Sequence, residues 1–147
     1  MNVNTIIFIY FLATTSLVVY FYLHEKKYRI TERKLFNLLI SVAKFLNIPI
    51  TYHDVLGDAA GAIYYFTTDK GVFIADSANI KIKNEYKERP SVLAHELGHY
   101  LSLKKYNDNS EQKADQQALE LCEAILTKKE KRILKIFLNV YFKNTTK

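Results

Sequence analysis

The hydrophobic and polar positions divide the chain into an uncharged first segment and a longer mixed remainder. Residues 5–23 read TIIFIYFLATTSLVVYFYL, in which fifteen residues are apolar or aromatic and none is charged. A helix of this length covers roughly 28 Å, close to the hydrocarbon thickness of a bilayer. The uncharged start MNVN and the bulky end YFYL are unlike a cleaved signal peptide. We therefore expect residues 1–24 to form a membrane anchor, with its span at about 5–23.

Behind the anchor, residues 25–147 carry the pattern of one small α+β domain. Apolar residues recur at helical spacing after Thr31, a suitable N-cap, and this helix is expected to end before Pro49. The runs IPITY, AIYYF and VFIAD are rich in β-branched and aromatic residues, which predicts short strands. The turn sequence TTDKG separates the last two runs, so we expect a β-hairpin over residues 62–76.

Three more helices are expected in the second half of the chain. Pro90 and Ser91 begin a helix that continues through Leu101, and Asn109 or Ser110 begins another that runs to about Leu126. The last helix is expected to start at the capping box TKKE, whose first residue is Thr127. Its apolar face comprises Ile133, Leu134, Phe137, Val140 and Tyr141.

The formal charge of +6 is unevenly distributed. Residues 25–34 carry a net charge of +3 and residues 127–147 carry +6, whereas residues 35–126 carry −3. A nucleic-acid-binding module would gather its basic residues on one recognition element, so we expect no direct nucleic-acid binding. Basic residues beside a membrane span are retained in the cytoplasm. Because they all follow the span here, we expect a single-pass membrane protein whose soluble domain faces the cytoplasm.

The most specific chemical signal is the motif HExxH at residues 95–99, inside the helix that follows Pro90. Residues at i and i+4 share one helix face, so His95 and His99 can bind one Zn²⁺. Glu96 lies about 100° round the helix and can act as a general base rather than as a ligand. Apolar neighbours favour burial of this helix, and two buried imidazoles need a shared partner. The sequence therefore predicts zinc as the cofactor.

A catalytic zinc site needs a third protein ligand, and the next helix offers four carboxylates: Glu111, Asp115, Glu120 and Glu123. The metzincin pattern is excluded, because Ser102 and Lys105 occupy the positions of its glycine and third histidine. We prefer Glu111 as the ligand, with Asp115 on the same helix face accepting the ring N–H of a ligating histidine. A later glutamate remains an alternative ligand.

The two motifs together resemble a known family. HELGH, followed by E-x-x-A-D-x-x-A at residues 111–118, is similar to the ImmA/IrrE family of zinc metallopeptidases, over roughly residues 31–126. The resemblance implies a small zincin-like domain with a gluzincin-like site, in which His95, His99 and Glu111 bind zinc and Glu96 is the base. It also implies a protein substrate, such as a DNA-binding helix-turn-helix repressor of a phage or mobile element.

Two other functions remain open. One is a non-catalytic, membrane-tethered interaction module in which zinc only stabilises the helices; Glu96 counts against it, because a structural site needs no base. The other is an extracytoplasmic envelope protease. The basic residues that follow the predicted span count against this function, because they favour a cytoplasmic domain. For the peptidase, an edge of the hairpin can hold an extended substrate. Its oxyanion could be assisted by one of five residues: Tyr52, His53, Tyr86, Tyr100 and Tyr106.

Overall fold

The computed structural model describes the backbone of residues 3–140, and the side chains of residues 10–140 except residue 137. Within this range the chain has the expected α+β fold, with a small sheet and several helices. The elements follow in the order α1 (Val3–Phe45), β1 (Ile50–His53), β2 (Gly61–Thr67), β3 (Phe73–Lys83), α2 (Pro90–Tyr106), α3 (Glu111–Ile125), α4 (Lys128–Ile133) and α5 (Lys135–Leu138). A short 3-10 turn, Asn84–Tyr86, precedes α2.

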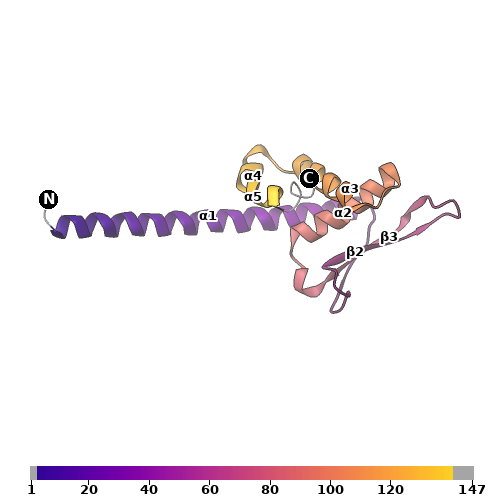
Figure 1. Cartoon of the computed structure of the whole chain (residues 1–147), viewed down its shortest axis with the longest axis horizontal. Helices are drawn as coiled ribbons and strands as arrows, with labels where there is room; N and C mark the ends of the chain where they lie inside the picture. Colours follow the sequence, from indigo (N-terminus) through magenta and orange to yellow (C-terminus); the bar gives the residue numbers. More distant parts are fainter. Residues whose placement is uncertain (1–2, 141–147) are drawn as a thin grey trace.

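One continuous helix, α1, replaces the separate anchor and domain helices that we expected (Figure 1). The predicted helix start at Thr31 is wrong: its hydroxyl donates to the carbonyl of Lys27, 2.8 Å away, inside the helix. No glycine or proline occurs before Pro49, and Glu25 pairs with Arg29 one turn later at 2.6 Å. Nothing in this stretch interrupts the helix, so the predicted boundary between residues 24 and 25 falls inside α1.

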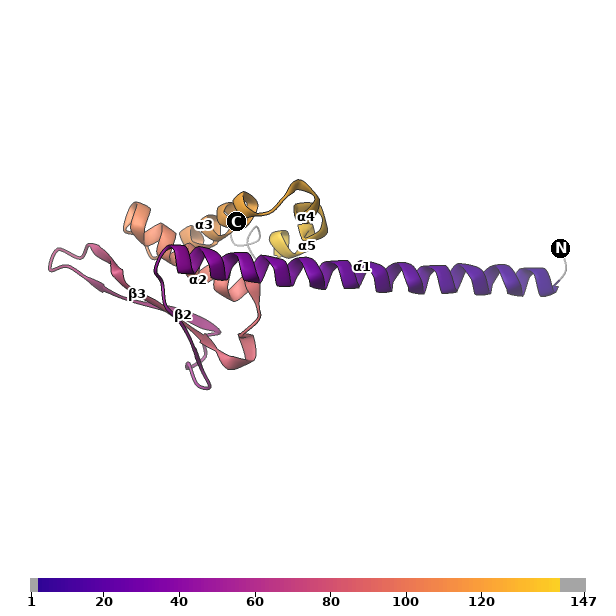
Figure 2. The ribbon, with the colours of Figure 1, turned by 180° about the vertical axis from the view of Figure 1, so that it is seen from behind.

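The first part of α1 extends beyond the rest of the protein (Figures 1 and 2). Its residues from Tyr10 to Leu23 are exposed. Where side chains are described, no helix contains a stretch both long and apolar enough to cross a membrane. The predicted span at 5–23 begins among residues 3–9, whose side chains lie outside the described set. The membrane anchor therefore stays a prediction.

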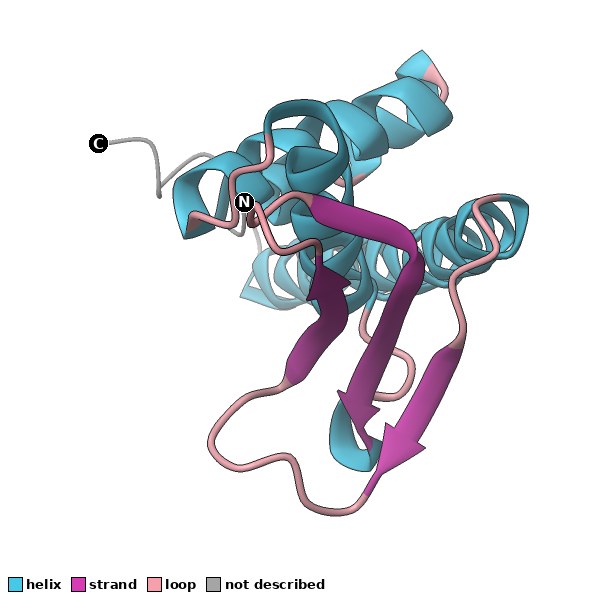
Figure 3. Cartoon of the chain, turned by 90° about the vertical axis from the view of Figure 1, so that its right-hand side faces the viewer, coloured by secondary structure: helices cyan, strands magenta, loops and turns pink. Residues whose placement is uncertain are grey.

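The sheet has the strand order β1-β3-β2 (Figure 3). β2 and β3 form the predicted antiparallel hairpin, closed by a turn in which Gly71 has a φ of 74° and Thr68 N–H donates to the carbonyl of Val72. β1 pairs in parallel with the second half of β3, which is longer than expected and continues to Lys83. β2 is consequently an edge strand.

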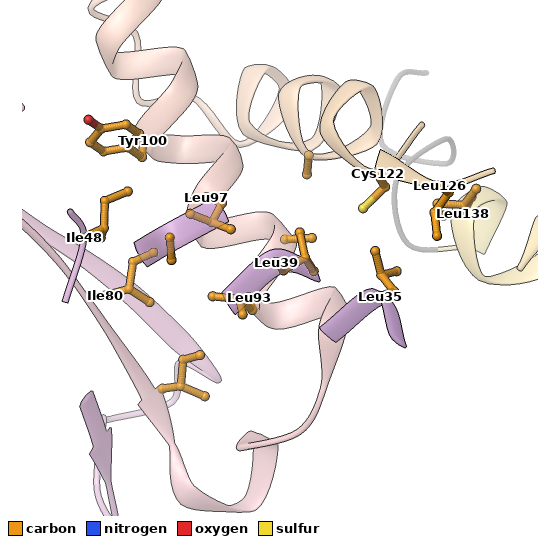
Figure 4. Packing of buried hydrophobic residues seen from close by; sticks show 14 of the residues in the cluster. Leu35, Leu39, Ile48, Ile80, Leu93, Leu97, Tyr100, Cys122, Leu126 and Leu138 are labelled. Carbon is orange, nitrogen blue, oxygen red and sulfur yellow. The ribbon is translucent and has the colours of Figure 1, made fainter. Parts of the chain in front are cut away.

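The hydrophobic core lies between the sheet, the last turns of α1, and helices α2 and α3 (Figure 4). Alternate residues of β3, such as Ile80 and Ile82, point to the helices and are fully buried. Leu93 and Leu97 of α2 are also fully buried, so this helix is packed on both its sheet side and its helix side. The core therefore fixes the position of the HExxH helix between the sheet and α3.

The carboxyl-terminal helix that we expected is divided into α4 and α5. The predicted capping box is confirmed: Glu130 N–H donates to the Thr127 hydroxyl, and Thr127 N–H donates to the Glu130 carboxylate. Leu134 then leaves the helical conformation, at φ −91° and ψ 12°. This break allows both Leu134 and Leu138 to be buried against the core. The side chain of Phe137, and Tyr141 altogether, lie outside the described residues.

Candidate metal centre

The helix that carries the two histidines begins where its sequence predicts and continues past Leu101 to Tyr106. Pro90 occupies the first turn, and Asn107 ends the helix with a left-handed φ of 53°. Gly98 lies at the contact with α3, where an added Cβ would come within 2.1 Å of the carbonyl oxygen of Ala114. Only a residue without a side chain permits this approach. The close contact brings the first turn of α3 against the histidines.

The structure brings His95, His99 and Glu111 together. The Nε2 atoms of the two imidazoles lie 3.1 Å apart, with the ring planes at 89°. Glu111, at the start of α3, places one carboxylate oxygen 3.0 Å from Nε2 of His95 and the other 3.5 Å from Nε2 of His99. One donor atom from each residue lies within 4.8 Å of the other two.

These donor atoms fit a tetrahedral zinc ion. With metal–ligand distances of about 2.0–2.1 Å, neighbouring donors of such a site are roughly 3.3 Å apart. The two Nε2 atoms are 3.1 Å apart, and the Glu111 carboxylate places one oxygen 3.0 Å from His95 and its other oxygen 3.5 Å from His99, so each of these distances is close to that value. Two imidazoles with one carboxylate are also a ligand set of catalytic zinc enzymes. The site can therefore hold a metal ion through these three residues.

Asp115 occupies the supporting position that we expected. Its carboxylate oxygen lies 2.8 Å from Nδ1 of His95, and the residue is only 5% exposed. Accepting the Nδ1–H leaves the Nε2 lone pair of His95 free to bind a metal. The later glutamates do not join the group: Glu120 instead accepts hydrogen bonds from Gln116 and Gln117 on its own helix. Among the carboxylates of α3, Glu111 is the one beside both histidines.

Glu96 lies next to the histidines but is not one of the converging donors. It is 5% exposed, and burial raises the pKa of its carboxyl to about 7, with Glu111 adding to the shift and His95 opposing it. The backbone N–H of Ile63 donates to this carboxylate. A Cβ at Gly61 would lie 3.0 Å from Glu96 Oε1, so β2 also packs closely on this side chain. The carboxyl is thereby positioned to exchange a proton.

A cavity of about 530 Å³ opens beside these side chains. The segment leading into β2 forms one wall, and α2 and the start of α3 form the others; the lining residues are Ala59, Ala60, Gly61, Ala62, Ile63, Ser91, Val92, His95, Glu96, His99, Asn109, Glu111 and Asp115. The exposed fraction of the Glu111 side chain, 79%, places it at the mouth of this cavity. The donor atoms of His95, His99 and Glu111 are therefore open to solvent through this cavity.

The cavity wall includes polar residues that the sequence analysis did not identify as site residues. Asn109, considered only as a helix cap, lies on its wall with Ser91. The five expected oxyanion-assisting residues are not among the residues that line it. Tyr100, for example, is buried against Phe73, with ring centroids 5.6 Å apart. Asn109 follows Asp108, whose backbone carbonyl accepts a hydrogen bond from the hydroxyl of Ser102, six residues earlier in α2.

Comparison of the chain with protein-family models, with curated proteins and with solved structures gives no match. The resemblance to the ImmA/IrrE family accordingly stays a prediction that rests on the two motifs. Any functional conclusion depends on the geometry of the cluster and its cavity.

Proposed function

We propose that this protein is a zinc-dependent peptidase that hydrolyses peptide bonds in a protein substrate. The observation that supports this best is the convergence of three metal donors, from His95, His99 and Glu111, beside the buried carboxyl of Glu96 on an open cavity. Structural zinc sites have four protein ligands, whereas catalytic sites have three and leave one position open. Three ligands, an accessible cavity and a base favour catalysis over a structural role.

Each residue has a distinct task in this proposal. His95, His99 and Glu111 hold the zinc ion, and Asp115 keeps the proton of His95 on Nδ1. When bound, zinc supplies a Lewis acid that polarises a carbonyl group and makes water more acidic. Glu96 accepts the proton of the attacking water and delivers it to the leaving amine. Its burial and its pKa near 7 suit a group that takes and returns a proton near neutral pH.

The substrate is expected to bind as an extended segment along β2. Ile80 of β3 donates its N–H to the carbonyl of Pro49, so its backbone polar groups face β1 and not β2. Ile63 of β2 lies opposite Ile80 in this antiparallel pair, and its own N–H therefore points away from β3, to the free edge of β2. The donation from Ile63 to Glu96 agrees with this direction. The free edge of β2 therefore runs past the base, and a peptide can pair with it. The resemblance adds a helix-turn-helix repressor as the candidate substrate.

We further propose that residues 5–23 anchor the enzyme in a membrane, with its domain in the cytoplasm. Three features support this: the nineteen uncharged residues, the exposed part of α1 that extends beyond the domain, and the basic residues that follow it. Carboxyl-terminal fusions test the orientation. We expect a fluorescent protein to be active there and alkaline phosphatase to be inactive. Strong phosphatase activity would favour the extracytoplasmic envelope protease instead.

The variant Glu96→Gln tests the enzymatic proposal, because it keeps the size of the side chain and removes the base. We expect the full-length variant to retain zinc and to lose peptide hydrolysis by roughly 10²–10⁴-fold. The assay compares protein fragments in cells that express wild type or variant at equal levels, with and without a chelator. Glu123→Gln, a change at an exposed position of α3, is the matched control and should leave cleavage unchanged.

One result would replace the enzyme with the interaction module. If wild type and Glu96→Gln gave the same fragments and the same cellular phenotype, while His95→Ala abolished that phenotype, zinc would serve only to hold the helices together. Glu96 would then have no role in the cellular function of the protein.

A further inference from the structure

Two segments that are far apart in the sequence form one surface at the end of the domain from which α1 extends. α4 and α5 lie alongside α1 on that side (Figures 1 and 2), and Glu130 of α4 pairs with Lys34 of α1. We call the surface formed by residues 25–34 and 127–140 the basic end. The catalytic cavity is built from other elements, so the basic end has no role in the proposed chemistry.

The basic end is where the net positive charge of the protein is concentrated. It contains ten lysines and arginines and three glutamates, a net charge of +7, whereas residues 36–126 carry −3. Nine of these ten basic residues are exposed, Lys131 being the half-buried exception. Such a concentration of cations attracts an anionic partner.

Exposed aliphatic side chains lie among these cations. Ile136 is 72% exposed and Val140 is 55% exposed, next to the lysines and arginines of α4 and α5. Cations combined with exposed aliphatic groups are typical of segments that lie in the headgroup region of a bilayer. A nucleic-acid backbone offers phosphates but no apolar layer to receive these aliphatic groups. The composition of the basic end therefore fits a lipid surface better.

The position of the basic end relative to the proposed span agrees with a lipid partner. Lys34 follows Leu23 by eleven residues of continuous helix, roughly 16 Å along the axis. A headgroup layer is about 5–7 Å thick, and charges interact through about 8 Å of physiological salt solution. Lysine and arginine side chains thus reach the region where anionic headgroups act on them.

We propose that the basic end docks on anionic phospholipid headgroups of the bilayer that holds the anchor. This inference rests on the anchor in the proposed function, not on the zinc chemistry. Docking holds the domain against the membrane surface, so that the orientation of the catalytic cavity depends on the lipid composition.

The test uses full-length protein in vesicles of neutral phosphatidylcholine, or of phosphatidylcholine with phosphatidylglycerol. Cys122 is fully buried, so Ile136→Cys provides one accessible thiol for an environment-sensitive fluorophore. We expect a blue-shifted emission in the anionic vesicles only, reversed by high salt. The same label at Lys70→Cys, in the exposed hairpin turn, should show no shift.

Charge reversal tests the residues themselves. Replacing Lys128, Lys129, Arg132 and Lys135 with Glu should abolish the shift and lower the affinity for anionic lipid by more than about tenfold. A control with the same change in net charge replaces Lys70, Lys87, Lys104 and Lys105, all exposed and outside the basic end. It should keep the shift.

Three results would overturn docking: equal emission in both vesicle types, a shift that survives charge reversal, or a shift produced by duplex DNA without vesicles. Flotation with neutral vesicles tests the anchor separately, and zinc content tests the metal site. Failure of either proposal is thus distinguishable from failure of the docking surface.

Discussion

Gly98 and Ala114 are in such close contact that a single added methyl group at Gly98 would lie 2.1 Å from the carbonyl oxygen of Ala114. This contact sets the distance between α2, which carries His95 and His99, and the start of α3, which carries Glu111. A larger separation of the two helices would move the Glu111 carboxylate away from the histidines. The glycine of HELGH is therefore a packing residue that sets the spacing of the three candidate metal donors.

The variant Gly98→Ala should consequently lose both stability and metal. The methyl group forces α2 and α3 apart, at a cost of about 3 kcal/mol in the free energy of unfolding. Gly57→Ala is the control, since its φ of 58° adds backbone strain of about 1 kcal/mol while no atom lies near its Cβ. Chemical denaturation and elemental analysis of the same samples measure both effects. Equal stability and equal zinc content in the two variants would contradict this account of the helix contact.

Glu111→Ala should empty the site. We expect about one zinc per wild-type chain and a decrease in affinity of more than about 100-fold in this variant, because one of three protein ligands is lost. Competition with a chromophoric chelator measures the affinity. Glu123→Ala, an exposed glutamate on the same helix, should bind zinc as wild type does. A loss of zinc in Glu123→Ala, with Glu111→Ala unaffected, would mean that α3 presents a different face to the histidines.

Asp115→Ala should weaken zinc binding by about 10–100-fold without removing it, because Nδ1 of His95 loses its acceptor. Asp115→Asn offers a carbonyl oxygen at the same place and should recover part of the affinity. The same chelator competition, repeated at several pH values, measures the zinc affinities of wild type, Asp115→Asn and Asp115→Ala, which we expect to decrease in that order. If the alanine and asparagine variants bound zinc equally, the hydrogen bond would have no effect on the metal.

Glu130 should make stability depend on pH in the acid range. Hydrogen bonds from Lys34 and Thr127 lower the pKa of its carboxyl to about 2. The pKa of this carboxyl is higher in the unfolded chain. The ionised carboxylate therefore stabilises the folded state above about pH 4.5, and this stabilisation is lost as the pH falls towards 2. Glu130→Gln should therefore be less stable than wild type by about 1 kcal/mol at pH 7, and this difference should shrink as the pH falls to 2.

Thermal unfolding of the full-length protein at both pH values measures this difference. Glu123→Gln should match wild type throughout, since Glu123 is exposed and makes no hydrogen bond or ion pair among the described residues. A Glu130→Gln deficit that stayed constant down to pH 2 would show that the ionised carboxylate is not the stabilising form.

The elements with local signals could be predicted from the sequence. Pro90 sets the start of α2, the turn before Val72 forms the hairpin, and Thr127 with Glu130 forms the capping box. Each of these signals acts between residues at most a few positions apart. For the same reason the i, i+4 spacing alone placed His95 and His99 on one face of a helix.

The full lengths of α1 and β3 were harder to predict, because no local sequence signal shows that they continue past the expected boundaries. The expected anchor segment and the expected first domain helix form one helix, α1, and the Thr31 hydroxyl donates to the carbonyl of Lys27 inside it instead of capping a helix start. β3 continues through residues 77–83, where Ala78, Ile80 and Ile82 alternate with polar residues. This alternation becomes a strand because β1 and β2 pair with it on both sides, and pairing partners are distant in the sequence.

Which carboxylate meets the histidines was decided only by the tertiary structure. The sequence determined that several acidic residues lie on the helix after HELGH, and it favoured Glu111 with Asp115 by their spacing. The approach of α2 and α3 at Gly98 selects Glu111, and the packing of β2 against Glu96 builds the cavity wall. Those contacts join segments separated by loops of the chain. Their geometry follows from how the whole core packs, which no short pattern of residues encodes.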